Sequence, residues 1–239
     1  MIRRRWWSIL GIVLVLVGGP LAAGGRAVAG GPPGAVATGT VRAWGNNGNG
    51  ELGDGGTTYS AAPVDVVGLD GVVSVAAGRA WSLALRADGG AWSWGFNTVG
   101  QLGDGTLAQR LAPVPVFGLT DLVGVAAGGS HGLALGRDGA VWAWGSNDQG
   151  QLGGTIDQDP HPYPRRVAGL PAVVAVAAGE VEGLALAADG TVWRWGYGQV
   201  RGGFGTTSAT PAPVAGLPAV VAIAAGSELR FALTADGAV

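Results

Sequence analysis

Short apolar runs, each about as long as a β-strand, are separated by turns rich in glycine along most of the chain. The run VVAVAAG at 173–179 is typical of them. In AVWAWG at 140–145, Trp142 and Trp144 share one face of an extended strand, and Val141 and Ala143 share the other. Because both faces are apolar, we expect such strands to be buried between neighbouring sheets.

The same motifs return with a period of about 50 residues. Trp-Gly recurs with its tryptophan at positions 44, 94, 144 and 195, and Ala-Ala-Gly and Asp-Gly keep the same spacing. Markers that share one period indicate a repeated structural unit, present about four times. We expect the units at 38–71, 72–121, 122–171 and 172–219, with a partial unit at 220–239. Asp-Gly, as at Asp88 and Gly89, predicts type I′ hairpins, in which both central residues have positive φ.

The full motif order resembles the repeat of the regulator of chromosome condensation family. Residues 125–153, VAAGGSHGLALGRDGAVWAWGSNDQGQLG, carry the resemblance almost position for position, and it extends over about 38–239. It implies an all-β fold: a β-propeller with four-stranded blades, usually seven of them, that serves as a platform for protein interactions. The loop after Trp195 departs from the pattern because it lacks Gln-Leu-Gly.

The two ends of the repeat region predict how the blades are arranged. The last unit breaks off at ADGAV (235–239), before its Trp-x-Trp-Gly strand, and TGTVRAWG (38–45) is such a strand. Pairing of these ends would close a ring of four units. We favour an open arc of a larger propeller, because blades shaped for seven would leave gaps or strain in a ring of four. Arg42 replaces a tryptophan in the first unit, so we expect that strand to be more exposed.

The N-terminus has the features of a secretory signal. Three arginines precede an apolar run at 6–17, and Ala27 and Ala29 flank Val28. We predict a signal peptide at 1–29 and a Gly/Pro-rich linker at 30–37, which makes the protein secreted or otherwise extracytoplasmic. An uncleaved membrane anchor is the alternative, which Gly18, Gly19 and Pro20 disfavour because they interrupt the helix.

Composition excludes several classes of function. Four of the 14 basic residues, all of them arginines, lie within 1–29, which leaves ten against 16 acids in the mature chain. Such a surface is a poor partner for nucleic acid. The chain has no cysteine, so disulfides, thiolate metal sites and cysteine nucleophiles are excluded.

The glycine-rich loops, such as NGNGELGDGG at 47–56, carry oxygen atoms that could bind a cation or surround a phosphate. They lack the strand–loop–helix context of a P-loop and the ligand spacing of an EF-hand. The leucine and glycine return in each copy, whereas the acids do not. We therefore expect structural loops anchored by Leu52, Leu102 and Leu152, with the glycines at positive φ.

Neither histidine predicts catalysis. His131 occupies a position filled by Trp81, Glu182 and Leu229 in the other units, and no partner nucleophile or orienting acid is indicated for it. His161 lies in DQDPHPYPRR and is interpreted as a solvated loop residue. We expect no enzymatic activity, no cofactor and no metal site.

A binding surface is the remaining candidate. Between Ala-Ala-Gly and the following apolar strand, four positions vary from unit to unit: RAWS, GSHG, EVEG and SELR. In a propeller these turns would gather on one face, and loops on a rigid scaffold commonly carry recognition. The candidate binding residues are Arg79, Trp81, Glu180, Glu182, Glu228 and Arg230, followed by Tyr163, Arg165 and Arg166 in the irregular loop 155–166.

These observations lead to one expected function and one alternative. The expected function is that of an exported, non-catalytic module that binds an unidentified protein. The resemblance extends this to inhibition or scaffolding of an extracytoplasmic protein, with membrane contact only if the N-terminal segment stays uncleaved. The alternative is carbohydrate or cell-wall binding through Trp81, which lies outside the strand pattern and could stack on a sugar.

Overall fold

The computed structural model describes residues 38–198, 206–227 and 229–235. The predicted signal peptide and linker lie outside the described residues. Every regular element within the described part is a β-strand. This part of the chain also holds no helix of the length and hydrophobicity needed to cross a membrane.

Three four-stranded antiparallel sheets form the middle of the protein, and we call them blades 1 to 3. Blade 1 contains β3 (Val72–Ala77), β4 (Trp81–Arg86), β5 (Ala91–Gly95) and β6 (Arg110–Pro115). Blade 2 contains β7 (Leu122–Ala127), β8 (His131–Gly136), β9 (Val141–Gly145) and β10 (His161–Arg166). Blade 3 contains β11 (Val173–Ala178), β12 (Glu182–Ala187), β13 (Val192–Gly198) and β14 (Thr206–Pro213).

Two-stranded sheets stand at the two ends of this series. The N-terminal half-blade consists of β1 (Arg42–Gly45) and β2 (Ser60–Asp65), and the C-terminal half-blade consists of β15 (Val220–Ala225) and β16 (Arg230–Thr234). By their place in the repeat, β1 and β2 correspond to the two outer strands of a blade, and β15 and β16 correspond to the two inner strands. In β1, Arg42 is exposed, as expected.

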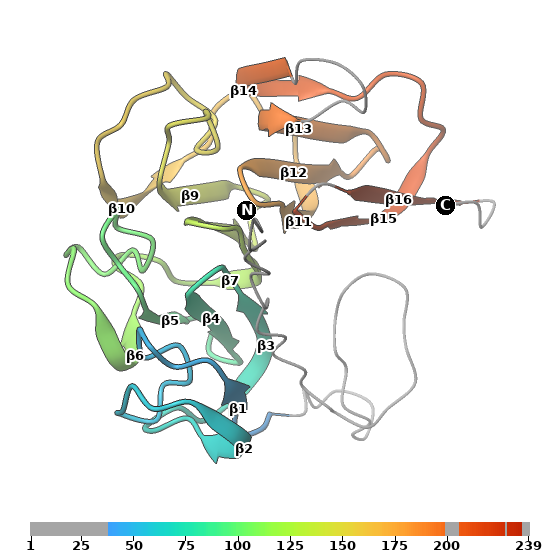
Figure 1. Ribbon diagram of the computed structural model, residues 1–239. Coiled ribbons are helices and arrows are strands. Elements are labelled where there is room, and N and C mark those ends of the chain that lie inside the picture. The colour runs from blue at the N-terminus through green and yellow to red at the C-terminus, as the bar shows by residue number, and fades with distance from the viewer. Residues whose placement is uncertain (1–37, 199–205, 228, 236–239) are drawn as a thin grey trace, which may run out of the picture.

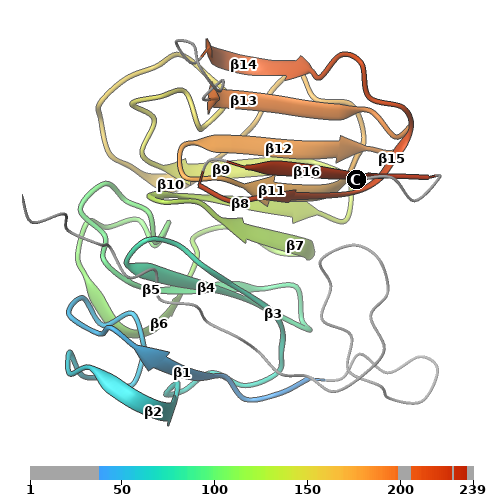
Figure 2. The same ribbon diagram turned by 45° about the vertical axis from the view of Figure 1, so that its right-hand side comes forward.

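The blades stand side by side in an arc that is not closed into a ring (Figures 1 and 2). The first strands β3, β7, β11 and β15 contact one another in succession along the inside of the arc, and the fourth strands lie on its rim. The half-blades lie at its two ends. This arrangement confirms the predicted all-β propeller arc over the closed four-unit ring.

Tryptophans join each blade to the unit before it. The indole Nε1 of Trp94 donates a hydrogen bond to the Glu51 carbonyl oxygen at 2.7 Å. Trp144 and Trp195 make the same bond to the loops of their preceding units, at 2.9 and 2.8 Å. All three side chains are buried. They therefore fill the space between blades, as the sequence predicts, and each also satisfies its polar N–H there.

The Asp-Gly hairpins differ from the predicted type I′ turns. In blade 1 the Gly89 amide donates to the Arg86 carbonyl at 3.0 Å, and the Arg86 amide donates to Gly90 at 2.9 Å. Gly89 has φ of 82°, whereas Asp88 is not among the residues with positive φ. This is the pattern of a three-residue loop, in which a single left-handed residue follows a type I turn. The type I′ prediction was wrong because the loop contains one more residue than it assumed.

The glycine-rich loops have the expected anchors. Gly50, Gly100 and Gly150 have φ of 77°, 79° and 80°, a conformation that glycine adopts without steric cost. The side chains of Leu52 and Leu102 are buried, and that of Leu152 is half-buried.

Candidate functional site

The variable turns join the first strand of each blade to the second, and their main chains are linked. The Arg79 amide donates to the Gly129 carbonyl oxygen at 3.2 Å, and the Gly129 amide donates to that of Glu180 at 3.0 Å. The turns of blades 1, 2 and 3 therefore form one continuous row at one end of the strands. We call the turns at 78–80, 128–130 and 179–181 the turn row.

Two predicted binding residues lie in the turn row with accessible side chains. Arg79 is exposed, and Glu180 is half-buried. The Glu180 side chain lies against Gly129, where an added Cβ would be 2.6 Å from the Glu180 carboxyl carbon. A cation and an anion thus stand on the first and third turns of the row, and the turn of blade 2 links them by main-chain hydrogen bonds that do not depend on either side chain.

Trp81 does not lie outside the strands, contrary to the sequence interpretation. It is the first residue of β4, and only 1% of it is exposed. Its indole Nε1 donates to the carbonyl oxygens of Gly128 and Gly129, at 3.2 and 3.1 Å. Trp81 therefore joins blade 1 to blade 2, and its ring has no exposed face for a sugar.

Glu182 and Arg230 form an ion pair within the arc. Glu182 is the first residue of β12 and is 2% exposed, and its carboxylate pairs with Arg230 of the C-terminal half-blade. Arg194 lies 4.0 Å from the other carboxylate oxygen. Burial raises the pKa of Glu182, and the charges of Arg230 and Arg194 oppose that rise. The pair joins blade 3 to the half-blade beside it. Glu228 lies outside the described residues.

His131 fills the position in blade 2 that Trp81 fills in blade 1. It is fully buried, and neither ring nitrogen has a hydrogen-bond partner among the described residues. Burial lowers the pKa of His131 to about 4, because a charged imidazolium would lose its hydration, and the nearby main chain of Glu182 and the charge of Asp148 oppose this shift. At neutral pH the ring is an uncharged packing group between blades 2 and 3.

Tyr163 lies on the rim, on the outer strand β10, and is 50% exposed. Its ring meets that of Phe117 edge to face, with centroids 5.2 Å apart. Arg165 and Arg166 are exposed on the same strand. Since β10 and β7 are the opposite edges of blade 2, the structure does not bring these three residues together with the turn row.

His161 is a buried strand residue, so its interpretation as a solvated loop residue was wrong. It begins β10, and its Nε2 atom lies 2.7 Å from the Asp157 carboxylate. Residues 161–166 form this strand within the segment that was expected to be irregular. The prolines at 162 and 164 obscured it in the sequence, but the strand lies at the edge of the sheet, where missing amide donors are tolerated.

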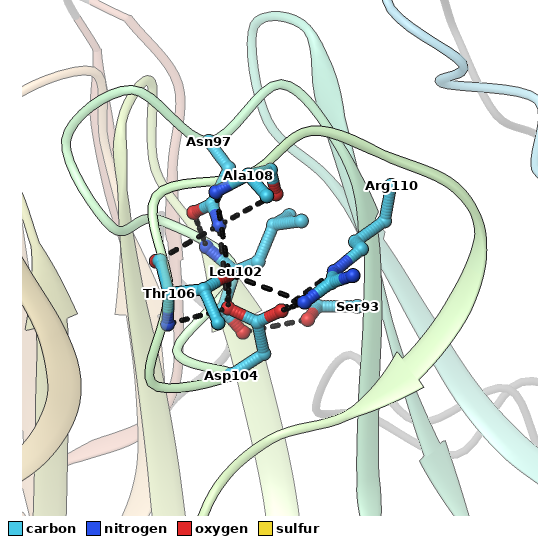
Figure 3. A network of polar contacts seen from close by, with 7 residues as sticks. All are labelled: Ser93, Asn97, Leu102, Asp104, Thr106, Ala108 and Arg110. Carbon is cyan, nitrogen blue, oxygen red and sulfur yellow. Dashed lines mark hydrogen bonds and ion pairs between the residues drawn. The ribbon is translucent and has the colours of Figure 1, made fainter.

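In the glycine-rich loop of blade 1, the polar side chains contact one another and the main chain of the loop itself (Figure 3). The Asn97 side chain accepts from the Leu102 amide at 3.0 Å and donates to the Thr106 and Ala108 carbonyls at 3.0 and 2.9 Å. Arg110 pairs with Asp104 at 2.8 Å. Burial alone would raise the pKa of Asp104, but hydrogen bonds from Thr106 and Arg110 lower it.

These polar groups therefore satisfy one another within the loop. Across the described part of the chain, no group of three or more His, Cys, Asp or Glu side chains is arranged to hold a metal ion.

Comparison with known families matches this repeat directly. The family model for the regulator of chromosome condensation (RCC1) repeat matches residues 38–85, 88–135 and 138–185, more than half of the chain. A second model of the same repeat matches 72–101 and 122–151. The chain belongs to the RCC1 repeat family. Comparison with curated proteins found no matching sequence.

Several solved structures have the same fold. Human WBSCR16 is 28% identical with a TM-score of 0.72, and the match covers 82% of this chain and 55% of that one. Prp20p from Saccharomyces cerevisiae, described with its binding to Gsp1p and histones, is 24% identical with a TM-score of 0.71 and coverages of 81% and 51%.

Yeast RCC1 (Prp20) bound to Kap60 is 27% identical, with a TM-score of 0.69 and coverages of 83% and 50%. The chain spans about half the length of these three proteins.

Proposed function

We propose that the chain is an exported, non-catalytic module that binds a protein outside the cytoplasm, as an inhibitor or a scaffold, through its turn row. The observation that carries the proposal is the main-chain link from Arg79 to Gly129 and on to Glu180. Because the backbone of the row is held by the fold, its side chains can vary without loss of the surface.

The family supports this choice of partner class. Yeast RCC1, a member of the same family, has been solved bound to the protein Kap60. In this chain the accessible charges of the row are of both signs, Arg79 and Glu180. A protein surface with complementary charges fits such a row better than a polyanion does.

Capture from the extracellular fraction tests the row. The full chain is immobilised as wild type, as Arg79→Glu with Glu180→Lys, and as Asp189→Lys. Asp189 lies in the hairpin after β12, at the other end of that strand from the turn row. We expect a protein that wild type and Asp189→Lys retain and that the double variant loses by at least about tenfold.

Equal retention of that protein by all three chains would place binding away from the turn row. Failure of the wild-type chain to retain any protein would remove the proposal itself. Circular dichroism of each variant shows whether the charge reversals leave the strands folded.

A reporter fusion tests export. Residues 1–37 joined to a phosphatase that is active only outside the cytoplasm should give activity, with cleavage after Ala29 read by mass spectrometry. Activity without cleavage would identify the segment as a membrane anchor, and a reporter that stays inactive would contradict export.

A further inference from the structure

An open pocket of about 580 Å³ lies between the hairpin of blade 2 and the segment that connects blade 1 to blade 2. The residues that line it come from the segment before β7, from the end of β8 and its hairpin, and from β9. They are Gly118, Leu119, Thr120, Asp121, Gly136, Arg137, Asp138 and Trp142. The pocket thus combines a half-buried indole ring with two carboxylates.

The equivalent site in blade 1 lies 50 residues earlier in the sequence, and a side chain of the protein itself occupies it. Arg86 corresponds to Gly136, and its guanidinium group pairs with Asp70 at 3.0 Å and with Asp88 at 3.4 Å. The guanidinium carbon lies 5.8 Å from the centre of the Trp92 ring. Asp88 and Trp92 correspond to Asp138 and Trp142 of the pocket.

In blade 2 the pocket is open because Gly136 has no side chain to fill it. The groups that contact the guanidinium in blade 1 have counterparts there in Asp138 and Trp142. Asp138 accepts the Ala140 amide with one oxygen at 3.0 Å, as Asp88 accepts that of Gly90 at 2.9 Å. The other oxygen of Asp88 is the one that Arg86 contacts. Asp70 is replaced by Thr120, and a carboxylate follows it directly at Asp121.

We propose that the pocket binds a guanidinium group supplied from outside the chain, the side chain of an arginine on a partner protein. A planar cation suits an indole face together with carboxylates. Arg137, which also lines the pocket, is exposed and forms no ion pair with a described acid, so neither carboxylate is already paired with it. That the guanidinium belongs to a protein rests on the proposed function, whereas binding of the group itself does not.

Titration with N-acetyl-arginine amide, followed by NMR of the tryptophan indole N–H signals, tests the site without a partner. We expect a saturable shift of the Trp142 signal in the millimolar to tens-of-millimolar range. The lysine analogue should bind at least severalfold more weakly. The citrulline analogue, which has the shape of arginine without its charge, should give no saturable shift.

Two exchange variants give a matched control. Gly136→Arg copies blade 1, and its own side chain should fill the pocket and weaken binding at least about tenfold. The added Cβ would meet the Asp138 carboxylate oxygen at 2.5 Å, a contact that rotation of Asp138 relieves. Arg86→Gly should open a second pocket and add a saturable shift of the Trp92 signal.

A titration in which citrulline matches arginine, in which Gly136→Arg binds as wild type does, or in which no Trp142 shift saturates would overturn the site. These outcomes leave the turn row untouched. Conversely, equal retention of the partner protein by wild type and by the double variant at Arg79 and Glu180 would contradict the proposed function. The result of the guanidinium titration would still stand.

Discussion

Blade 2 and the C-terminal half-blade carry the same repeat, yet their second strands differ in exposure. Leu133 in β8 and Phe231 in β16 occupy the same register, opposite Ala126 and Ala224. Leu133 is 0% exposed, whereas Phe231 is 51% exposed. The difference lies in the neighbour: Leu133 packs with residues of blade 3, and the described residues contain no sheet beyond β16. Burial in this arc is therefore supplied by the next unit along the chain, as in other repeat proteins.

The largest effect is expected from truncation at this shared position. Leu133→Ala should lower the free energy of unfolding by about 2–5 kcal/mol, because it leaves a cavity between blades 2 and 3. Phe231→Ala should cost about 1 kcal/mol or less, since half of the ring is already in water. Urea unfolding of both variants measures the difference. Similar losses in the two would show that Phe231 is covered in solution.

Two residues before Leu133 and Phe231 lie His131 and Leu229, and at this position too we expect blade 2 and the half-blade to differ, here in how pH affects stability. The pKa of His131 is about 4 in the fold, below its ordinary value of 6.5, so the unfolded chain binds more protons between these values. The contribution of His131 is complete above pH 6.5 and is lost as the pH falls toward 4, by roughly 3 kcal/mol. Glu182, whose pKa is raised, contributes with the opposite sign.

The matched variants are His131→Leu and Leu229→His. The first should remove the loss of unfolding free energy between pH 7 and 4.5, while the second should add none, because position 229 is 63% exposed. Urea midpoints at the two pH values test both expectations. An unchanged pH slope in His131→Leu would assign the slope to other groups.

Glycine substitution probes the seam between neighbouring blades. A Cβ at Gly128 would lie 2.1 Å from the His131 ring and 2.7 Å from the Gly179 carbonyl oxygen. At Gly226, the equivalent position in the half-blade, the nearest heavy atom would be 3.9 Å away. We expect Gly128→Ala to cost about 1–3 kcal/mol through overpacking. Gly226→Ala should stay within about 0.5 kcal/mol in the same thermal unfolding assay.

The sequence predicted those features of the fold that depend on the repeat itself. The period, the strands, the tryptophans between blades and the left-handed loop glycines all follow from residues that recur, and the structure confirms them. The hairpin type was wrong because Asp-Gly alone does not report the length of a loop.

The candidate site was harder to predict, because exposure depends on neighbours that the local pattern does not name. Trp81 and Glu182 occupy the same position of the repeat, and this position differs in each unit, which suggested that it is on the surface. Both side chains are instead buried between units. The pocket at Gly136 has no sequence motif of its own, because it depends on the absence of a side chain. Comparison of Arg86 with Gly136 at the 50-residue spacing could have indicated it.

The smallest effect is expected from the ion pair of the N-terminal half-blade. Arg42 and Asp65 are joined at 2.8 Å, but their side chains are 65% and 68% exposed. Asp65→Asn should change the free energy of unfolding by less than about 1 kcal/mol, and 1 M salt should remove most of that change, because water and ions screen the charges.

In the pair formed by Arg110 and Asp104, the Asp104 side chain is only 4% exposed. Asp104→Asn should therefore cost more and respond less to salt, because the amide is a weaker acceptor at a side chain that is almost fully buried. Equal salt responses of the two variants would contradict the view that burial of the carboxylate, rather than the ion pair as such, sets the strength of these polar contacts.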